Sequence, residues 1–195
     1  MGLNDTPLAS RTQIGIFGKT NAGKSSILNL LAGQDMSIVS PEAGTTTDPV
    51  AKPMELLPIG PVMLYDTAGL CDESALGDER QKKTKRILRR TDIGIVVVAA
   101  DEPVKGNMLA EKEIVSGFKR SGIPFVVLQN KIDKCTDQML EREELVRELG
   151  ITCDDIFSLS AKEAYGRPDI TAMLRNRIAK LKKPEEKERA IVSDL

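Results

Sequence analysis

One short segment, residues 18–25, restricts the fold of this chain more than any other. Its sequence is GKTNAGKS, which has the pattern GxxxxGK[ST]. It follows an apolar run at residues 13–17, which we expect to be a strand, and it opens a segment at residues 24–32 that we expect to be a helix. A strand, a glycine-rich turn and a helix in this order are typical of a phosphate-binding loop in an α/β protein.

The rest of the chain alternates between strand and helix patterns. The further expected strands are residues 53–57, 61–65, 93–100, 125–129 and 156–159, and the further expected helices are residues 78–90, 108–120, 137–149 and 169–181. Pro58, Ile59 and Gly60 predict a hairpin, which makes one strand antiparallel. The predicted fold is a three-layer α/β sandwich with about six strands, mostly parallel with one antiparallel strand near an edge, and about five helices.

Composition excludes several functions. The chain contains no histidine, so no imidazole base or histidine metal ligand exists in it. Its three cysteines, Cys71, Cys135 and Cys153, are widely spaced and predict neither a disulfide framework nor a metal-binding knuckle. A net charge of -1 argues against a broad nucleic-acid surface. Without an apolar run of membrane-spanning length or a signal peptide, we expect a cytoplasmic protein and no membrane partner.

Residues 18–25, hereafter the P-loop, carry the first set of predicted roles. Glycines let backbone N–H groups surround phosphates, and the helix N-terminus adds its dipole. We expect Lys24 to contact the β and γ phosphates and Ser25 to ligate Mg²⁺ through its hydroxyl. The predicted nucleotide-binding residues here are Gly18, Asn21, Ala22, Gly23, Lys24, Ser25 and Ser26.

Two further segments are expected near the γ-phosphate. The sequence DTAG at residues 66–69 follows a strand, so Asp66 should lie near Mg²⁺ and the Gly69 amide near the γ-phosphate. In the long loop before the expected strand at residues 53–57, the sequence GTTTD at residues 44–48 offers hydroxyl groups. We expect Thr46 to complete the Mg²⁺ coordination, so that GTP orders this loop and hydrolysis releases it. A merely solvated threonine-rich loop is the alternative.

The sequence NKID at residues 130–133 predicts the base that is bound. The carboxylate of Asp133 can accept hydrogen bonds from N1–H and the 2-amino group of guanine, and adenine lacks both donors, a difference of several kcal/mol. Asn130 should tie this segment to the P-loop, and the stem of Lys131 should cover the base. After the last strand, the Ala161 amide can meet guanine O6. That strand is followed by the predicted binding residues Ser160, Ala161 and Lys162.

These motifs in this order resemble the translation-factor-related GTPases. The P-loop with Asn21 and the GTTTD segment resemble the Era and MnmE group. The run GTTTDPV…MELLPIGPVMLYDTAGLCDE…LGDERQKKTKRIL…TDIGIVVV, within residues 44–98, is similar to the HydF family of [FeFe]-hydrogenase maturation GTPases. This resemblance implies GTP or GDP and Mg²⁺ as ligands. Through the full-length protein, it implies hydrogenase maturation proteins and the hydrogenase as partners.

The HydF resemblance also implies a division of the chain. Residues 1–11 would be an N-terminal arm, residues 12–183 the GTPase domain, and residues 184–195 a linker with the start of a truncated further domain. A natural chain end is the alternative for the last segment. HydF proteins carry a dimerisation domain and an iron–sulfur cluster domain after the GTPase domain. The cluster ligands are absent here, so we expect no iron–sulfur cluster in this chain.

Leu70 departs from the pattern of many GTPases, which place a water-orienting glutamine after DxxG. Relatives with an apolar residue there use K⁺ near the phosphates. This similarity implies slow, K⁺-stimulated hydrolysis with Asn21 as a K⁺ ligand. The alternative, given equal weight, is that Asn21 is only a turn residue of the P-loop. Such relatives also form dimers through the surface that carries the loops responding to GTP, here called the switch face. A dimer of this chain is therefore one of the possibilities. The predicted catalytic residues are Lys24, Thr46, Gly69 and Asn21.

Three functions compete on this evidence. The leading hypothesis is a GTP-hydrolysing nucleotide switch in the maturation of the [FeFe]-hydrogenase metallocofactor. The second is a nucleotide-gated protein-binding module with negligible hydrolysis, which Leu70 motivates. The third is an RNA-linked GTPase like Era or MnmE, against which the near-neutral charge weighs, so a nucleic-acid partner is not expected.

Overall fold

The computed structural model of this chain describes residues 11–32, 51–66, 87–104, 108–135, 138–164 and 168–182. The strands are β1 (Thr12–Phe17), β2 (Ala51–Leu56), β3 (Gly60–Asp66), β4 (Ile93–Ala99), β5 (Phe125–Asn130) and β6 (Ile156–Ser158). The helices are α1 (Lys24–Ala32), α3 (Leu109–Ser121), α4 (Gln138–Leu149), α5 (Ala161–Ala164) and α6 (Pro168–Ala179), with short 3₁₀ helices η2 (Ile132–Lys134) and η3 (Cys153–Asp155).

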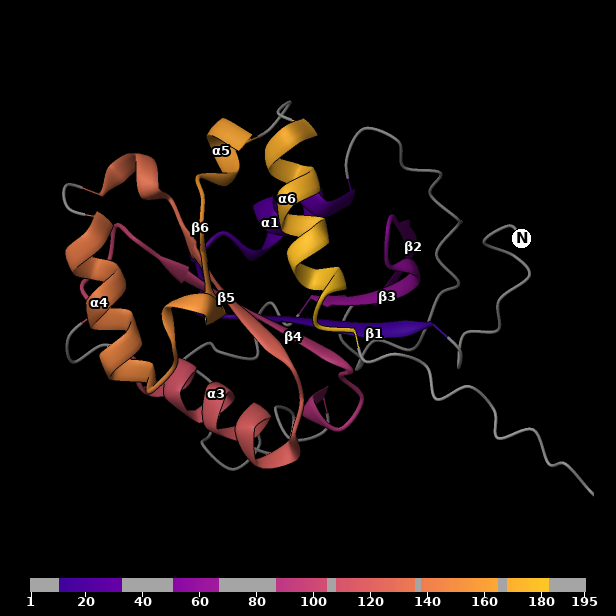
Figure 1. Cartoon of the computed structure of the whole chain (residues 1–195), viewed down its shortest axis with the longest axis horizontal. Helices are drawn as coiled ribbons and strands as arrows, with labels where there is room; N and C mark the ends of the chain where they lie inside the picture. The colour runs from indigo at the N-terminus through magenta and orange to yellow at the C-terminus, as the bar shows by residue number, and fades with distance from the viewer. Residues whose placement is uncertain are drawn as a thin grey trace, which may run out of the picture.

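The six strands form one sheet in the order β2-β3-β1-β4-β5-β6 (Figure 1). β2 pairs antiparallel with β3 at one edge, and every other pairing is parallel. The predicted mixed sheet with one antiparallel edge strand is therefore confirmed. The parallel register matters for the site, because it sets Ile16 beside Asp66 and Ala99 beside Asn130.

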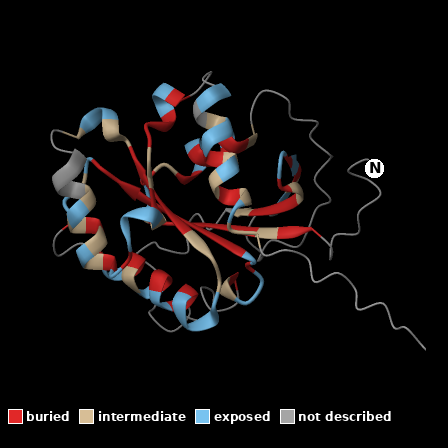
Figure 2. Ribbon diagram, in the orientation of Figure 1, coloured by how far each residue is buried: buried red, intermediate tan, exposed pale blue. Residues whose placement is uncertain are grey.

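Helices cover both faces of the sheet, as Figure 1 shows. The central strand β4 is buried along its whole length (Figure 2). Successive side chains of a strand point to opposite faces of the sheet. Ile95 and Val97 belong to the apolar cluster that contains residues of α1, α5 and α6. Val96 and Val98 belong to the cluster that contains residues of α3 and α4. A strand that packs against helices on both faces must be apolar at every position, which explains the continuous run in the sequence.

Most predicted helices differ from the structure by one or two residues at their ends. α3 ends before Gly122, whose N–H donates to the Lys119 carbonyl. The short helix α5 was not predicted, because four residues are too few to show a helical period. It brings the number of helices in the described part of the chain to five. The predicted helix at residues 78–90 lies almost wholly outside the described residues.

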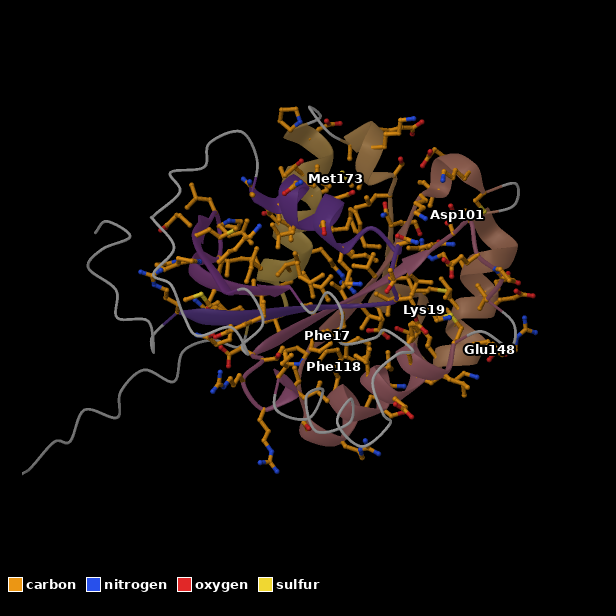
Figure 3. All side chains as sticks on the ribbon, turned by 180° about the vertical axis from the view of Figure 1, so that it is seen from behind. Phe17, Lys19, Asp101, Phe118, Glu148 and Met173 are labelled. Carbon is orange, nitrogen blue, oxygen red and sulfur yellow. The ribbon has the colours of Figure 1, made fainter. Side chains whose placement is uncertain are left out.

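Phe118 joins α3 to the sheet on the α3 and α4 face. Its ring meets the edge of Phe17 at a centroid distance of 5.2 Å, and it stacks on Phe125 at 5.6 Å. Figure 3 labels Phe17 and Phe118, which lie next to each other. Phe17 is the residue before the P-loop, so this aromatic contact fixes the point where the loop leaves β1. Within the described ranges, no helix is both long and apolar enough to cross a membrane.

Candidate nucleotide-binding site

The predicted binding residues gather at one edge of the sheet. β1, β3, β4, β5 and β6 are joined by parallel pairings, so their carboxyl ends meet at the same edge. The P-loop follows β1, Asp66 is the last residue of β3, Asn130 is the last residue of β5, and Ser160 comes two residues after β6. Ligands of doubly wound sheets bind outside these carboxyl ends.

The P-loop backbone adopts conformations that require two of its glycines. Gly18 has a φ of 142° and Gly23 a φ of 97°, both in the region that side chains disfavour. A Cβ atom at Gly18 would overlap the Val97 carbonyl oxygen, and one at Gly23 would overlap the side-chain amide of Asn130. The loop is therefore packed closely against β4 on one side and against the end of β5 on the other.

Lys24 lies inside the curve of the P-loop. Its ammonium donates hydrogen bonds to the carbonyl oxygens of Gly18 at 2.8 Å and Lys19 at 2.7 Å, and the side chain is buried. These bonds use two of the three ammonium donors and leave one for an anion. The loop thus encloses a positive charge beside the N-terminus of α1, where free N–H groups also favour anions.

The polar side chains that the sequence assigns to ligands point toward solvent at this loop. Asn21, Ser25 and Ser26 are exposed. Their hydroxyl and amide oxygens are accessible to a cation, so the described part of the loop fits a Mg²⁺ bound beside a phosphate. Of the other predicted Mg²⁺ ligands, Thr46 lies outside the described residues, and only the backbone of Asp66 is described.

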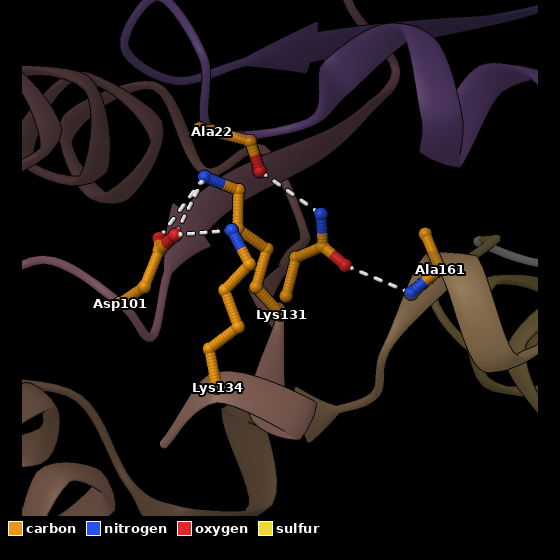
Figure 4. Close-up of polar contacts among 6 residues, drawn as sticks. Ala22, Asp101, Lys131, Lys134 and Ala161 are labelled. Atoms are coloured by element: carbon orange, nitrogen blue, oxygen red, sulfur yellow. Dashed lines mark hydrogen bonds and ion pairs between the residues drawn. The ribbon is translucent and has the colours of Figure 1, made fainter.

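Asn130 connects three segments of the site. Its side-chain N–H donates to the Ala22 carbonyl in the P-loop at 3.0 Å, and its side-chain oxygen accepts from the Ala161 N–H at 2.9 Å (Figure 4). Asn130 is 2% exposed, so both hydrogen bonds are shielded from water. The predicted tie between the residue 130–133 segment and the P-loop is present, and it extends to the start of α5.

Asp133 projects from η2 into solvent. A hydrogen bond from the Ser160 side chain lowers the pKa of Asp133. The carboxylate is therefore ionised at neutral pH and available as an acceptor for two donors of a base. The structure brings Asp133 and Ser160 together, as expected for a site in which both residues face one ligand. Lys162 follows them in α5 and is exposed.

Lys131 has a partner that the sequence did not reveal. Its ammonium bonds both carboxylate oxygens of Asp101, at 3.0 and 3.1 Å. Lys134 bonds the same carboxylate at 3.0 Å (Figure 4). Partial burial by itself would raise the pKa of Asp101, but the two lysine hydrogen bonds and charges lower it overall. The one available signal was that Asp101 stands just after a buried strand, at the same sheet edge as the known motifs.

A buried carboxylate also lies next to the P-loop. Glu111 in α3 is 2% exposed, and its Oε2 lies 3.9 Å from the Lys19 ammonium. That oxygen accepts no hydrogen bond within the described residues. Burial raises the pKa of Glu111, and the charge of Lys19 opposes this only in part. Lys19 and the surrounding segment can be located in Figure 3.

The remaining predicted residues cannot be placed. Gly69 and Leu70 lie outside the described residues, as do the acidic residues that follow them. In the described ranges, no three histidine, cysteine, aspartate or glutamate side chains come together as a metal-binding group. The roles of the placed residues in binding a nucleotide stay predictions from their chemistry and position.

Comparison with known protein families shows that this chain matches one of them. Residues 13–131 match the family described as 50S ribosome-binding GTPase. Among curated proteins, the chain is 32% identical over 166 residues to the tRNA modification GTPase MnmE of Heliobacterium modesticaldum, covering 84% of this chain and 33% of that protein. It is 41% identical over 124 residues to the same enzyme of Cupriavidus metallidurans, covering 60% of this chain and 26% of that protein. The chain therefore spans a third or less of the length of these relatives.

Solved structures agree on the fold. An Era variant from Aquifex aeolicus bound to GDP.AlF4- superposes with a TM-score of 0.59 at 26% identity, covering 85% of this chain and 56% of that chain. The G domain of the T. maritima protein FeoB superposes with a TM-score of 0.60 at 21% identity, covering 89% of this chain and 99% of that chain. The second similarity concerns the fold alone. Together they confirm the predicted P-loop GTPase architecture.

Proposed function

Because this chain belongs to the family of 50S ribosome-binding GTPases, we propose that it binds GTP with Mg²⁺ and hydrolyses it to GDP and phosphate. The observation that best supports this is the pair of buried hydrogen bonds from Asn130 to Ala22 and Ala161. They tie the P-loop, the segment at residues 130–133 and the start of α5 to one another. The groups proposed to bind the phosphates and those proposed to bind the base would then be in place before the nucleotide binds. Residues 12–183 are the proposed GTPase domain.

Different residues are proposed to bind the phosphates, the base and the Mg²⁺ ion. Lys24 supplies a fixed positive charge inside the P-loop, where backbone N–H groups also point at an anion. Asp133 would accept from the two donors on the edge of guanine, and the exposed hydroxyl of Ser25, with Asp66 and Thr46, would hold Mg²⁺. When bound, Mg²⁺ would neutralise charge on the phosphate oxygens. The chain's own contribution is to bind and orient the nucleotide.

Hydrolysis is proposed to be slow and stimulated by K⁺, with Asn21 as a ligand of that ion. The exposed side chain of Asn21 at the P-loop supports this, since its φ of 64° holds it in a left-handed turn on the solvent side. A cation there would stabilise developing negative charge, as an arginine finger does in other GTPases. Pairing of two chains on the switch face is part of the same proposal.

Steady-state turnover of GTP tests the hydrolysis proposal. The rate is measured in K⁺ buffer and in Na⁺ buffer of equal ionic strength, for the unaltered chain and for Asn21→Ala. We expect K⁺ to stimulate the unaltered chain and not the variant. Equal rates of the unaltered chain in both salts would refute the K⁺ site. Turnover at the level of the uncatalysed reaction in both salts would favour the nucleotide-gated binding module instead.

The proposed biological role is a nucleotide switch in [FeFe]-hydrogenase maturation. The similarity of residues 44–98 to the HydF family supports it. Binding to the hydrogenase and to its other maturation proteins would be compared with GDP and with a non-hydrolysable GTP analogue. We expect the affinity to depend on the nucleotide. Equal affinity in both states would remove the switch role.

The competing proposal is a role linked to RNA, because the similar curated proteins are named tRNA modification GTPases. The net charge of -1 opposes it, since a protein that neutralises many phosphates needs a basic surface. Retention of the chain on tRNA that weakens as salt rises would favour this role. Absence of retention at low salt would exclude it for this chain.

A further inference from the structure

Asp101 occupies a place that the sheet register determines. In the parallel pairing of β4 with β5, Ala99 is opposite Asn130, and the N–H of Ala100 donates to the Asn130 carbonyl at 2.7 Å. Lys131 follows Asn130 directly and Asp101 comes two residues after Ala99, so both lie just past the ends of these two strands. The two side chains meet because β4 and β5 end at the same edge of the sheet.

The carboxylate of Asp101 holds both ends of one short turn. Lys131 is the residue before η2 and Lys134 is its last residue, and both ammonium groups bond this carboxylate. The side chains of Asp101 and Lys131 are 22% and 24% exposed, while that of Lys134 is 57% exposed. A single exposed ion pair restricts little, but two lysines that converge on one carboxylate hold the turn at two points.

This turn needs such support. Lys131 has a φ of 65°, a left-handed conformation that costs energy for a residue with a side chain. Asn130 fixes the backbone on the strand side of the turn, but its hydrogen bonds do not reach the residues beyond Lys131. Asp133 stands inside the turn, between the two lysines, and its side chain is exposed. Ser160 also contacts this carboxylate, and the backbone that carries it is positioned by the turn, so its direction depends on both.

We propose that Asp101 is a positioning residue for base recognition, which fixes the turn at Lys131 and Lys134 and so directs Asp133 at the edge of guanine. This inference rests on the proposed function, because it assumes that Asp133 faces a base. Asp101 itself does not need to touch the nucleotide. If it is only a surface ion pair, its removal will leave base selectivity unchanged.

The variant Asp101→Asn keeps the shape of the side chain and removes its charge. Dissociation constants are measured for GDP, for inosine diphosphate, which lacks the 2-amino group, and for a non-hydrolysable GTP analogue. We expect GDP to bind on the order of tenfold more weakly, within the range that residues without ligand contact produce. The preference for GDP over inosine diphosphate should shrink, because a misdirected Asp133 gains less from the second donor. The ratio between GTP analogue and GDP should not change, since the phosphate end is untouched.

Glu102→Gln is the matched control. It removes the adjacent carboxylate, which takes part in none of the ion pairs of this turn, and it should leave the GDP preference unaltered. Thermal unfolding of each variant checks that the fold is kept. An unchanged ratio of GDP to inosine diphosphate affinity in Asp101→Asn would overturn the inference. Failure of the unaltered chain to bind GDP would instead refute the proposed function.

A double-mutant cycle gives a second, independent answer. Lys131→Met keeps the apolar stem over the base and removes the ammonium. If Asp101 acts through Lys131, the double variant should lose less GDP affinity than the sum of the two single losses. Strictly additive losses would show that Asp101 acts by another route and would contradict the inference.

Discussion

Asn130 and Ala22 lie 108 positions apart in the sequence, and the side-chain amide of Asn130 donates a hydrogen bond of 3.0 Å to the main-chain carbonyl of Ala22. The same side chain accepts from the N–H of Ala161. The carboxyl ends of β1 and β5 and the start of α5 are therefore coupled through one buried amide. Stability and nucleotide affinity should respond together when this amide is removed.

Asn130→Ala should lower the free energy of unfolding by on the order of 3 kcal/mol, because it leaves the Ala22 carbonyl and the Ala161 N–H buried without partners. It should also weaken GDP binding. Urea unfolding and GDP titration measure the two effects. Asn176→Ala, an exposed asparagine on α6, is the control and should change stability by less than about 0.5 kcal/mol. A loss as small as that of the control would contradict the coupling described here.

Gly23→Ala should lower the free energy of unfolding by more than the left-handed backbone conformation at this position alone explains. Gly60 has a similar φ, 94° against 97°, but a Cβ atom there would contact nothing. Gly60→Ala should therefore cost about 1–2 kcal/mol from the left-handed conformation. Gly23→Ala should cost more, since its methyl group also displaces the Asn130 amide, and it alone should weaken GDP binding. Equal unfolding free energies and equal GDP affinities for the two variants would rule out this packing argument.

Glu111 should make stability depend on pH. Its pKa is raised in the folded state above the ordinary value of 4.5, so the folded chain binds this proton more tightly than the unfolded chain does. The contribution to stability is then fully present below pH 4.5 and is lost as the pH rises through the folded pKa. Glu111→Gln, which carries no titrating proton, should lack this loss and be more stable than the unaltered chain at neutral pH.

The pH effect is measured by urea unfolding between pH 4 and pH 8, a window of about four units around the ordinary glutamate range. Glu113→Gln is the control, because Glu113 is an exposed carboxylate on the same helix α3. The stability gap between Glu111→Gln and the unaltered chain should widen with rising pH, and that of the control should not. A gap that narrows with rising pH would show that the pair with Lys19 outweighs burial.

Much of the fold could be predicted because its signals are local. The continuous apolar run of β4, the turn before β3 and the helix stop at Gly122 each follow from a few neighbouring residues. The order of the P-loop, Asp66 and the segment from Asn130 likewise follows from motif spacing. The antiparallel edge strand could be predicted for the same reason, since a hairpin turn is a local feature.

The contacts that distinguish this site could not be predicted, because they depend on register and packing between distant segments. Asp101 meets Lys131 only once β4 and β5 are aligned. Glu111 has the sequence context of an ordinary solvated helix residue, since charged residues are rarely fully buried. Its burial against Lys19 results from how α3 is set against the P-loop by Phe118. A single sequence contains no local sign of either relationship.

Selectivity between guanine and adenine is the most direct test of the central claim. Dissociation constants for GDP and ADP are measured by titration calorimetry with Mg²⁺, for the unaltered chain and for Asp133→Asn. We expect the unaltered chain to bind GDP at least about 100-fold more tightly than ADP, because adenine offers the Asp133 carboxylate neither of the two donors that guanine offers. Asp133→Asn should lose this preference and gain affinity for xanthosine diphosphate, whose C2 oxygen accepts from the new amide. Equal binding of GDP and ADP by the unaltered chain would contradict the claim that this is a guanine-nucleotide site.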